Sequence, residues 1–408
     1  ITISKIKKAI NFIQNMGVKY LLFRTFYEIR KKIPGYPGLK RKYPVSYKIQ
    51  QFISLASWKK KPANFFFNSR DDLPGYSLNQ KEIADLKSEF QHIKEGKIKF
   101  FDAFHVDLGK NHDWVTNPES GYKYNKNQHW TKINEFIAEN GDIKYVWEKS
   151  RFCYLNTIIR YDRHCKNDQA KFVFEEILSW IEANPLNCGP NYTSSQEIAI
   201  RVLNWIFALY YYKNSKYLTD TIFQVLINSI YWQTKHVEKN ITFSRIAVRN
   251  NHLITESLLL YVVGLLFTFL PNSQNFKKKG KQYLEEEGLY QIYEDGSYLQ
   301  FSFNYHRVVI QLYTWAFYLA RANNEKFSDQ LHDRLKRTLD LLCQHQDTIT
   351  GMLPNYGAND GSLFFKLSNC NYRDFRPQLN ALHYYFNEKT LYQSGIWDED
   401  IFWYQRPP

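Results

Sequence analysis

Helical periodicity from residue 126 onward is the feature that most limits what this chain can fold into. Apolar residues recur there at helical spacing, and clusters of Gly, Pro or Asn such as Asn184-Pro185-Leu186-Asn187 separate the segments. The pattern predicts helices over about 144–163, 168–184, 194–212, 217–236, 249–270, 273–287, 303–322, 328–345 and 375–388. Short polar loops between successive helices are typical of antiparallel helical hairpins. With an aromatic content of 17%, which suits thick helix–helix interfaces, they predict a mostly all-α protein built as an incomplete α/α toroid.

The chain divides into three predicted parts. Residues 1–125 combine a basic amphipathic helix or pair of helices, Ile6 to Lys32, with a loop-rich region whose few regular elements include a β-like run at Lys97 to Phe101. The amphipathic segment fits either an anionic membrane surface or the main domain. Residues 126–390 form the toroid. In residues 391–408, several aromatic side chains would leave an apolar patch at a terminus, which predicts that a further domain begins there. These residues are Trp397, Phe402, Trp403 and Tyr404.

Charge and composition limit the classes of binding partner that the sequence favours. Lys and Arg number 54 against 40 Asp and Glu, a formal charge of +14, and this surplus favours an anionic partner unless it serves solubility alone. The basic residues form no stripe with a recognised motif, so we expect no nucleic acid as partner. The most hydrophobic run, Leu258 to Leu270, is too short for a membrane-spanning helix. Widely spaced cysteines without a CxxC pair, and no cluster with metal-ligand spacing, identify no metal ligands and no cofactor, while a structural ion bound elsewhere stays open.

Two polar stretches interrupt segments that are otherwise apolar. Glu197 and Arg201 lie four residues apart on one helical face, where they either brace two helices as an ion pair or line a site. The run Arg249-Asn250-Asn251-His252 precedes a hydrophobic helix. Helix capping and a pair between His252 and Glu256 would explain some of these residues. Four consecutive polar groups in front of a buried helix favour a functional site over capping alone.

A third stretch, Asn304-Tyr305-His306, follows Ser302 at a spacing that places Tyr305 and His306 on the helical face of Ser302. A Tyr beside a His offers two groups that can move a proton, and a stacked aromatic pair is the alternative. The polar glycine loop from Pro354 to Gly361 is a weaker candidate for the same site.

In their order along the chain, these stretches resemble the heparinase II/III family of polysaccharide lyases. The resemblance covers about residues 100–370 and rests on four short motifs, which are Asp142 to Arg151 (DIKYVWEKSR), the helix with Glu197, Arg201 and Trp205, Asn250-Asn251-His252-Leu253, and Asp295-Gly296-Ser297-Tyr298 followed by Tyr305-His306. It implies an N-terminal α/α toroid and a C-terminal β-sandwich, which these residues lack, with the active site between the two. It also implies a bacterial protein that is periplasmic or secreted, although no signal peptide is visible and a cytoplasmic location stays open. The basic N-terminal stretch is similar to members associated with bacterial exopolysaccharides.

The implied chemistry is β-elimination on an acidic, uronate-containing polysaccharide. Removal of the proton α to the uronate carboxylate needs hydrogen-bond donors that stabilise the developing charge, a Tyr or His that takes the proton, and a Tyr that can protonate the leaving glycosidic oxygen. The resemblance implies that Asn251, or else His252, neutralises the carboxylate and that Tyr305 is the acid or acid/base. The predicted substrate-binding residues are Arg249, Asn250, Glu197, Arg201, His306 and Asn304.

Two other functions stay open on the sequence. A glycoside hydrolase on the same toroid needs two carboxylates across the scissile bond, for which Glu197, Asp295 and Asp360 are candidates. A non-catalytic glycan-binding accessory protein would use the charge and the aromatic residues for binding alone. The resemblance also implies a His from the β-sandwich domain, with no matching position among these residues, which puts the activity of this chain by itself in question. The sequence sets no oligomeric state.

Overall fold

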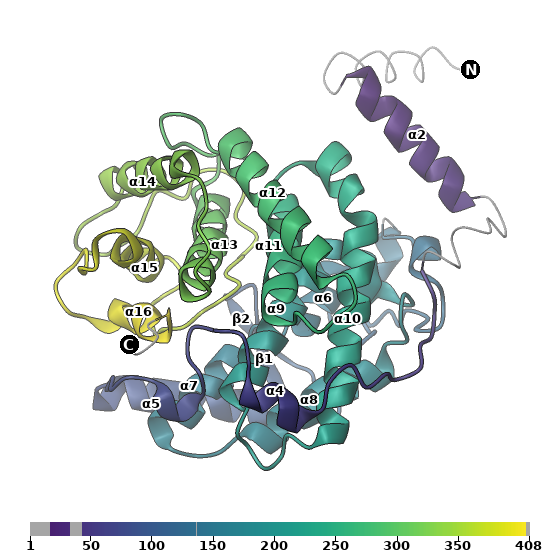
Figure 1. Cartoon of the computed structure of the whole chain (residues 1–408), viewed down its shortest axis with the longest axis horizontal. Helices are drawn as coiled ribbons and strands as arrows, with labels where there is room; N and C mark the ends of the chain where they lie inside the picture. The colour runs from purple at the N-terminus through teal and green to yellow at the C-terminus, as the bar shows by residue number, and fades with distance from the viewer. Residues whose placement is uncertain (1–16, 33–42, 136, 405–408) are drawn as a thin grey trace.

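Two layers of helices form the body of the protein in the computed structural model, which describes residues 17–32, 43–135 and 137–404 (Figure 1). Five helices contact one another in sequence as an inner layer: α7 (Leu155–Cys165), α9 (Ser195–Tyr211), α11 (Asn251–Leu266), α13 (Phe303–Ala322) and α15 (Arg376–Asn387). The helices between them lie outside: α8 (Ala170–Ala183), α10 (Asp220–Phe243), α12 (Ser273–Gln291) and α14 (Asp329–Gln344). The predicted toroid of helical hairpins is confirmed.

Composition explains which helices lie inside. Every residue of α9 is buried, and α11 and α13 are buried along almost their whole length. A helix that is apolar on all sides is stable only when neighbours cover every face. Outer helices α12 and α14 carry runs of charged residues that remain in solvent, so only one face of each packs inward.

Helices α11 and α12 approach closely because of two glycines. A Cβ atom added at Gly264 would collide with the backbone of Lys277, and one added at Gly280 would collide with the backbone of Tyr261. The two helices therefore pack backbone to backbone, which larger side chains at these positions would prevent.

The predicted helix over 144–163 is two helices, and this part of the prediction is wrong. Helix α6 (Lys144–Ser150) ends before α7 begins at Leu155. Between them Phe152 adopts a positive φ of 59°, a conformation that no α-helix accepts, while its ring is buried against Trp114. Apolar periodicity continues through this break, so the sequence pattern did not reveal it.

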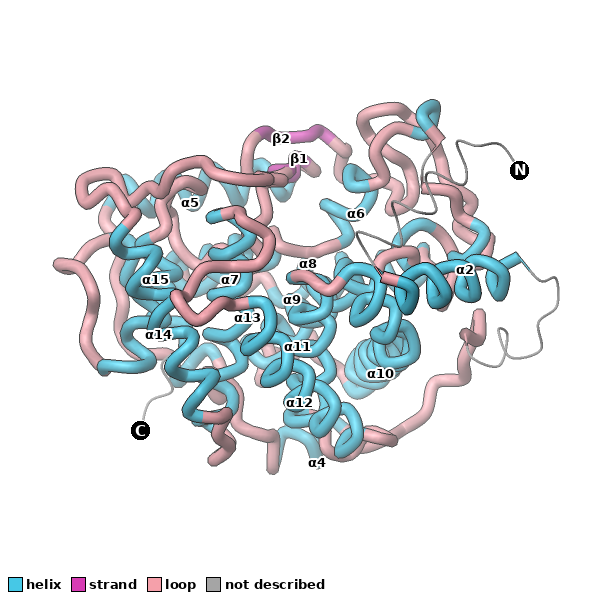
Figure 2. The backbone as a smooth tube through the Cα atoms, turned by 90° about the horizontal axis from the view of Figure 1, so that it is seen from above, coloured by secondary structure: helices cyan, strands magenta, loops and turns pink. Residues whose placement is uncertain are grey.

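The N-terminal region contains more regular structure than predicted. Helix α5 (Gln80–Lys94) was not expected, although Asn79 and Glu82 form a reciprocal capping box at its start. The short helix α4 (Leu55–Lys60) lies before it. The β-like run is confirmed as strand β1 (Lys97–Phe100), which pairs antiparallel with β2 (Phe104–Asp107). This hairpin, magenta in Figure 2, has its first strand in contact with α6.

The amphipathic basic segment is described from residue 17, and its earlier part lies outside the described residues. Helix α2 (Val18–Lys32) packs on the end of α10, where the ring of Tyr27 lies 4.6 Å from that of Phe243 and Arg24 lies over the same ring. The apolar residues Val18, Leu22, Phe26 and Ile29 remain exposed. One face of this helix contacts the main domain, as one of the two predictions has it. The other prediction, an anionic membrane surface, stays a prediction for the face that meets solvent.

The aromatic residues near residue 400 are buried, so the expected exposed apolar patch is wrong for Phe402, Trp403 and Tyr404. They belong to α16 (Glu399–Tyr404), which packs on α15 and reaches back to α7. There Glu399 pairs with Arg160 at 2.6 Å and with His164 at 2.9 Å. Among the described residues, no helix combines the length and the apolar character needed to cross a bilayer.

Candidate active site

The predicted polar stretches lie in the first turns of the inner helices, along one rim of the toroid. Glu197 lies in the first turn of α9, Asn251 and His252 in that of α11, and Tyr305 in that of α13. Because one outer helix separates each inner helix from the next, the inner helices run in the same direction and their starts share a rim. Residues far apart in the sequence thus meet in space.

An irregular turn shapes the start of α11. The preceding segment Ser244–Val248 is a π-helix, and Arg249 then adopts a left-handed conformation with φ of 40°. Asn250 caps the helix, because its Oδ1 atom accepts a hydrogen bond from the His252 backbone N–H at 3.0 Å. Arg249 turns toward α12, where its guanidinium stacks 3.4 Å above the ring of Tyr290. Both residues set the geometry of the turn that presents Asn251 and His252.

Asn251 and His252 differ in exposure and in hydrogen bonding. Asn251 is 1% exposed, and within the described part of the chain neither its amide nitrogen nor its amide oxygen has a hydrogen-bond partner. His252 is half-buried. Burial lowers the pKa of its imidazole to about 4, and the negative charge of Glu197 opposes this shift only in part. His252 is therefore neutral at pH 7, with one ring nitrogen able to donate and the other able to accept.

Tyr305 faces a carboxylate. The Ser302 side chain caps α13 by accepting a hydrogen bond from the Tyr305 backbone N–H at 3.2 Å. The Tyr305 hydroxyl donates to Oδ2 of Asp360, in the glycine loop, and Lys144 Nζ lies 3.7 Å from the same oxygen. Burial, and then the contact with Asp360, raises the pKa of Tyr305 well above its usual value. The phenol therefore carries its proton at neutral pH, and its raised pKa makes it a weaker acid than a free tyrosine.

Arg151 links these elements, although sequence reasoning did not single it out. Its Nε and Nη2 atoms lie 2.6 and 3.0 Å from the two carboxylate oxygens of Glu197, and Nη1 binds Glu148. Its guanidinium lowers the pKa of both Tyr305 and His252, so it acts on the two groups at once. Arg151 and Lys144 both lie in the DIKYVWEKSR run, which was the available signal.

Glu197 and Arg201 do not pair with each other, which corrects both predictions made for Arg201. Glu197 is held by Arg151 from another helix. Arg201 is fully buried, donates to Gln233 at 2.8 Å and stacks 4.0 Å from the ring of Trp180. Arg201 therefore braces the core and cannot reach a substrate.

His306 and Asn304 also point away from Tyr305, because successive residues of a helix are rotated by roughly 100°. His306 is buried against the ring of Tyr298, and its Nε2 lies 3.4 Å from Oγ1 of Thr338. Asn304 is buried and accepts a hydrogen bond from Arg307 at 2.9 Å. In this conformation both side chains are engaged by other residues of the protein, and their contact with substrate stays a prediction.

Glu256 has a different partner from the one predicted. Its carboxylate accepts a hydrogen bond at 2.5 Å from Ser244 and not from His252. Burial raises the pKa of Glu256 to about 8.

A match over residues 54–384 to the model of the heparinase II/III N-terminus accounts for most of the chain. The chain belongs to the heparinase II/III family. The match spans the inner-helix starts that carry Glu197, Asn251, His252 and Tyr305.

The proteins similar to this chain include lyases of two bacteria. A curated heparin-sulfate lyase of Bacteroides thetaiotaomicron is 29% identical over 148 residues, which are 36% of this chain and 20% of that protein. The crystal structure of heparinase III aligns with a TM-score of 0.52 and 17% identity over 80% of this chain and 50% of that one. Heparan sulfate lyase HepC from Pedobacter heparinus aligns with a TM-score of 0.50 and 16% identity over 74% of this chain and 44% of that one. The chain thus spans at most about half the length of these relatives, and the structural likeness shows a shared fold.

Proposed function

We propose that this chain supplies the helical part of the active site of a polysaccharide lyase that cleaves an acidic, uronate-containing polymer by β-elimination. One observation carries the proposal: a protonated Tyr305 lies on the same rim as a neutral His252 and the unpartnered amide of Asn251. These groups match the needs of β-elimination, which are neutral hydrogen-bond donors for a carboxylate and an acid for the leaving oxygen.

In the proposed reaction, Asn251 and His252 hold the uronate carboxylate. The amide N–H and the imidazole N–H donate to it, and they stabilise the negative charge that grows as the C5 proton leaves. His252 acts as a donor because a base with a pKa of about 4 is too weak to remove a carbon-bound proton. Asn251 is covered in this structure, so the substrate must displace the side chains around it.

Tyr305 is the proposed general acid. As the C5–H bond breaks and C4=C5 forms, the C4–O4 bond breaks and O4 takes the phenolic proton. The tyrosinate is then reprotonated from solvent, with Lys144 limiting the negative charge that Asp360 and Tyr305 share. The base that accepts the C5 proton belongs outside these groups, in line with the His that the family resemblance implies on a β-sandwich domain. On this proposal the 408 residues alone have little activity.

The glycoside hydrolase alternative is less well supported at two of its three candidate carboxylates. A glycoside hydrolase needs a carboxylic acid with a raised pKa facing a second carboxylate. Asp295 has its pKa lowered by hydrogen bonds from Ser297, and Glu197 is locked by Arg151. A periplasmic or secreted location, and a role in exopolysaccharide metabolism, are proposals that rest on the family resemblance alone.

The test is the Tyr305→Phe variant, made in the full-length protein. Release of unsaturated uronate from heparan-type and other acidic polysaccharides is followed by ultraviolet absorbance. We expect the rate to fall by about 10²–10⁴-fold while substrate binding is retained. Tyr384→Phe, on α15, serves as the matched control with an unchanged rate. Products with only saturated ends would favour a hydrolase, and binding without any products would favour an accessory protein.

A further inference from the structure

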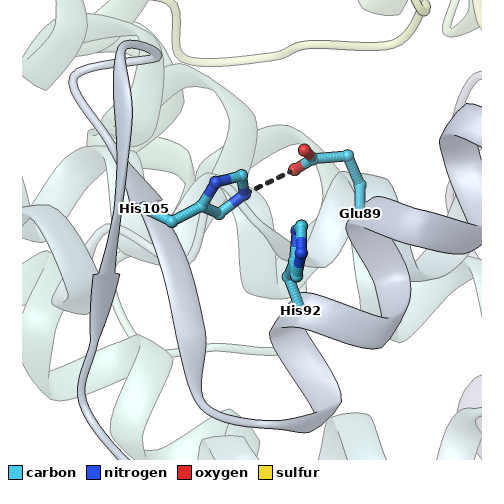
Figure 3. Close-up of side chains that lie close together, drawn as sticks. All are labelled: Glu89, His92 and His105. Atoms are coloured by element: carbon cyan, nitrogen blue, oxygen red, sulfur yellow. Dashed lines mark hydrogen bonds and ion pairs between the residues drawn. The ribbon is translucent and has the colours of Figure 1, made fainter.

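Three potential metal ligands, none of them among the proposed catalytic groups, converge where α5 meets the β-hairpin. Glu89 and His92 lie three residues apart on one face of α5, and His105 lies on strand β2 (Figure 3). One ligand atom from each lies within 4.8 Å of the others. We propose that Glu89, His92 and His105 bind a divalent transition-metal ion, with Zn²⁺ as the occupant that their chemistry favours.

The distances suit a shared ion. Zinc binds His nitrogen at about 2.0–2.1 Å and carboxylate oxygen at about 2.0–2.2 Å, so two ligands of a tetrahedral ion lie about 3.3 Å apart. Glu89 Oε2 and His105 Nε2 already lie 3.2 Å apart. The rings of His92 and His105 have centroids 4.4 Å apart, and a nitrogen of His92 lies within 4.8 Å of both other ligand atoms. Three protein ligands leave a fourth position for water.

A simple ion pair between Glu89 and His105 does not account for His92. The Nδ1 atom of His92 is buried and has no hydrogen-bond partner within the described residues, an unfavourable state for a polar atom. The neighbouring lysines do not fill this role, because Lys94 lies over the ring of Phe172 and Lys97 pairs with Glu95. A bound cation supplies a partner to both imidazoles at once.

The ligand types select the ion. Imidazole nitrogen favours zinc and similar transition metals, whereas magnesium and calcium prefer sites made of oxygen atoms alone. Sequence spacing did not indicate this site, because the third ligand comes from the hairpin and not from α5. The backbone N–H of Phe101, in the turn of the same hairpin, donates to Glu148 at 3.0 Å. An ion that joins α5 to the hairpin would therefore stabilise an element that also contacts Glu148.

The experiment uses protein stripped with EDTA and then dialysed. ZnCl₂ is titrated by calorimetry, and bound metal is counted by mass spectrometry after gel filtration. We expect one equivalent of Zn²⁺, a higher melting temperature when it is bound, and no comparable effect of MgCl₂ or CaCl₂.

Variants identify the site. His92→Ala and His105→Gln should each weaken Zn²⁺ binding by at least about tenfold and remove the thermal shift. His345→Ala removes an exposed histidine that is outside the cluster and should change neither. Circular dichroism checks that each variant is folded, and His105 is exposed enough that its loss should not unfold the chain. Less than about 0.2 equivalents bound to the wild type, or equal binding by wild type and His105→Gln, would overturn the proposal.

Discussion

Replacing Arg151 with Met should be among the most costly single substitutions in this protein. The guanidinium makes two hydrogen bonds to Glu197 and another to Glu148, and the three side chains are at most 10% exposed. Met replaces the aliphatic part of the side chain but leaves two carboxylates buried without their cation. Breaking a buried pair in this way costs about 3–5 kcal/mol. Adding the free energies of the three separate hydrogen bonds would give a larger loss, but that sum ignores the cost of removing the Arg151 guanidinium from water in the folded state.

The assay is urea unfolding at pH 7, with Arg245→Met as the matched control. Arg245 forms an ion pair of 2.7 Å with Glu286, but both side chains are more than a third exposed. A solvent-exposed pair contributes about 0–1 kcal/mol. The two variants remove the same charge and the same number of atoms, so the difference between them isolates burial. Equal losses of unfolding free energy would refute the reasoning.

The same variant has a second readout at the candidate active site. Arg151 lowers the pKa of His252, and Glu197 raises it. Loss of the guanidinium removes the first effect and frees Glu197 to strengthen the second. The imidazole pKa should therefore rise from about 4, which NMR titration of the His252 ring can follow. An unchanged pKa in a folded variant would show that Arg151 does not act on His252.

Two further predictions concern stability. Gly280→Ala should lower the unfolding free energy by about 1–3 kcal/mol, because the added methyl group meets the Tyr261 backbone and this outweighs the better helix propensity of Ala. The control Gly75→Ala has open space around it and should lie within about 0.5 kcal/mol of wild type in the same urea titration. The pKa of Glu256 is about 8 in the folded state, above its unfolded value, so the folded state binds more protons and the unfolding free energy should fall as pH rises from about 4.5 to 8. Glu256→Gln should lack that part of the fall. If the unfolding free energies of the two proteins change with pH in parallel, the assignment is contradicted.

The helical layers were predictable because local signals and burial agree. The predicted range 303–322 for α13 matches the structure, and 194–212 for α9 is within one residue at each end, since Ser302 and Ser194 each precede a segment whose apolar residues recur at helical spacing. Helix α5 was missed for the opposite reason: its sequence is mostly polar, and a region rich in Pro and Gly surrounds it. Its capping box was a usable signal.

Positions in the candidate active site were predictable, but side-chain directions and partners were not. The spacing rule for helices paired Glu197 with Arg201, whereas the real partner, Arg151, comes from another element 46 residues earlier. Tyr305 and His306 are adjacent in sequence, yet only Tyr305 meets Asp360. Which of two neighbouring residues faces a site depends on the rotation of the helix, and tertiary packing sets that rotation.

The net charge of +14 does not by itself explain how such a rim would hold an anionic sugar. Three of its cations are already engaged, Arg151 by Glu197 and Glu148, Lys144 by Asp360, and Arg249 by Glu287. The neutral donors in the first turn of α11 are the side chains of Asn251 and His252, and the helix dipole at this end also favours an anion. Recognition of a uronate would then rest on neutral hydrogen bonds aimed by Asn250 and the turn before it. Charge elsewhere on the surface would act at longer range, by attracting the polymer.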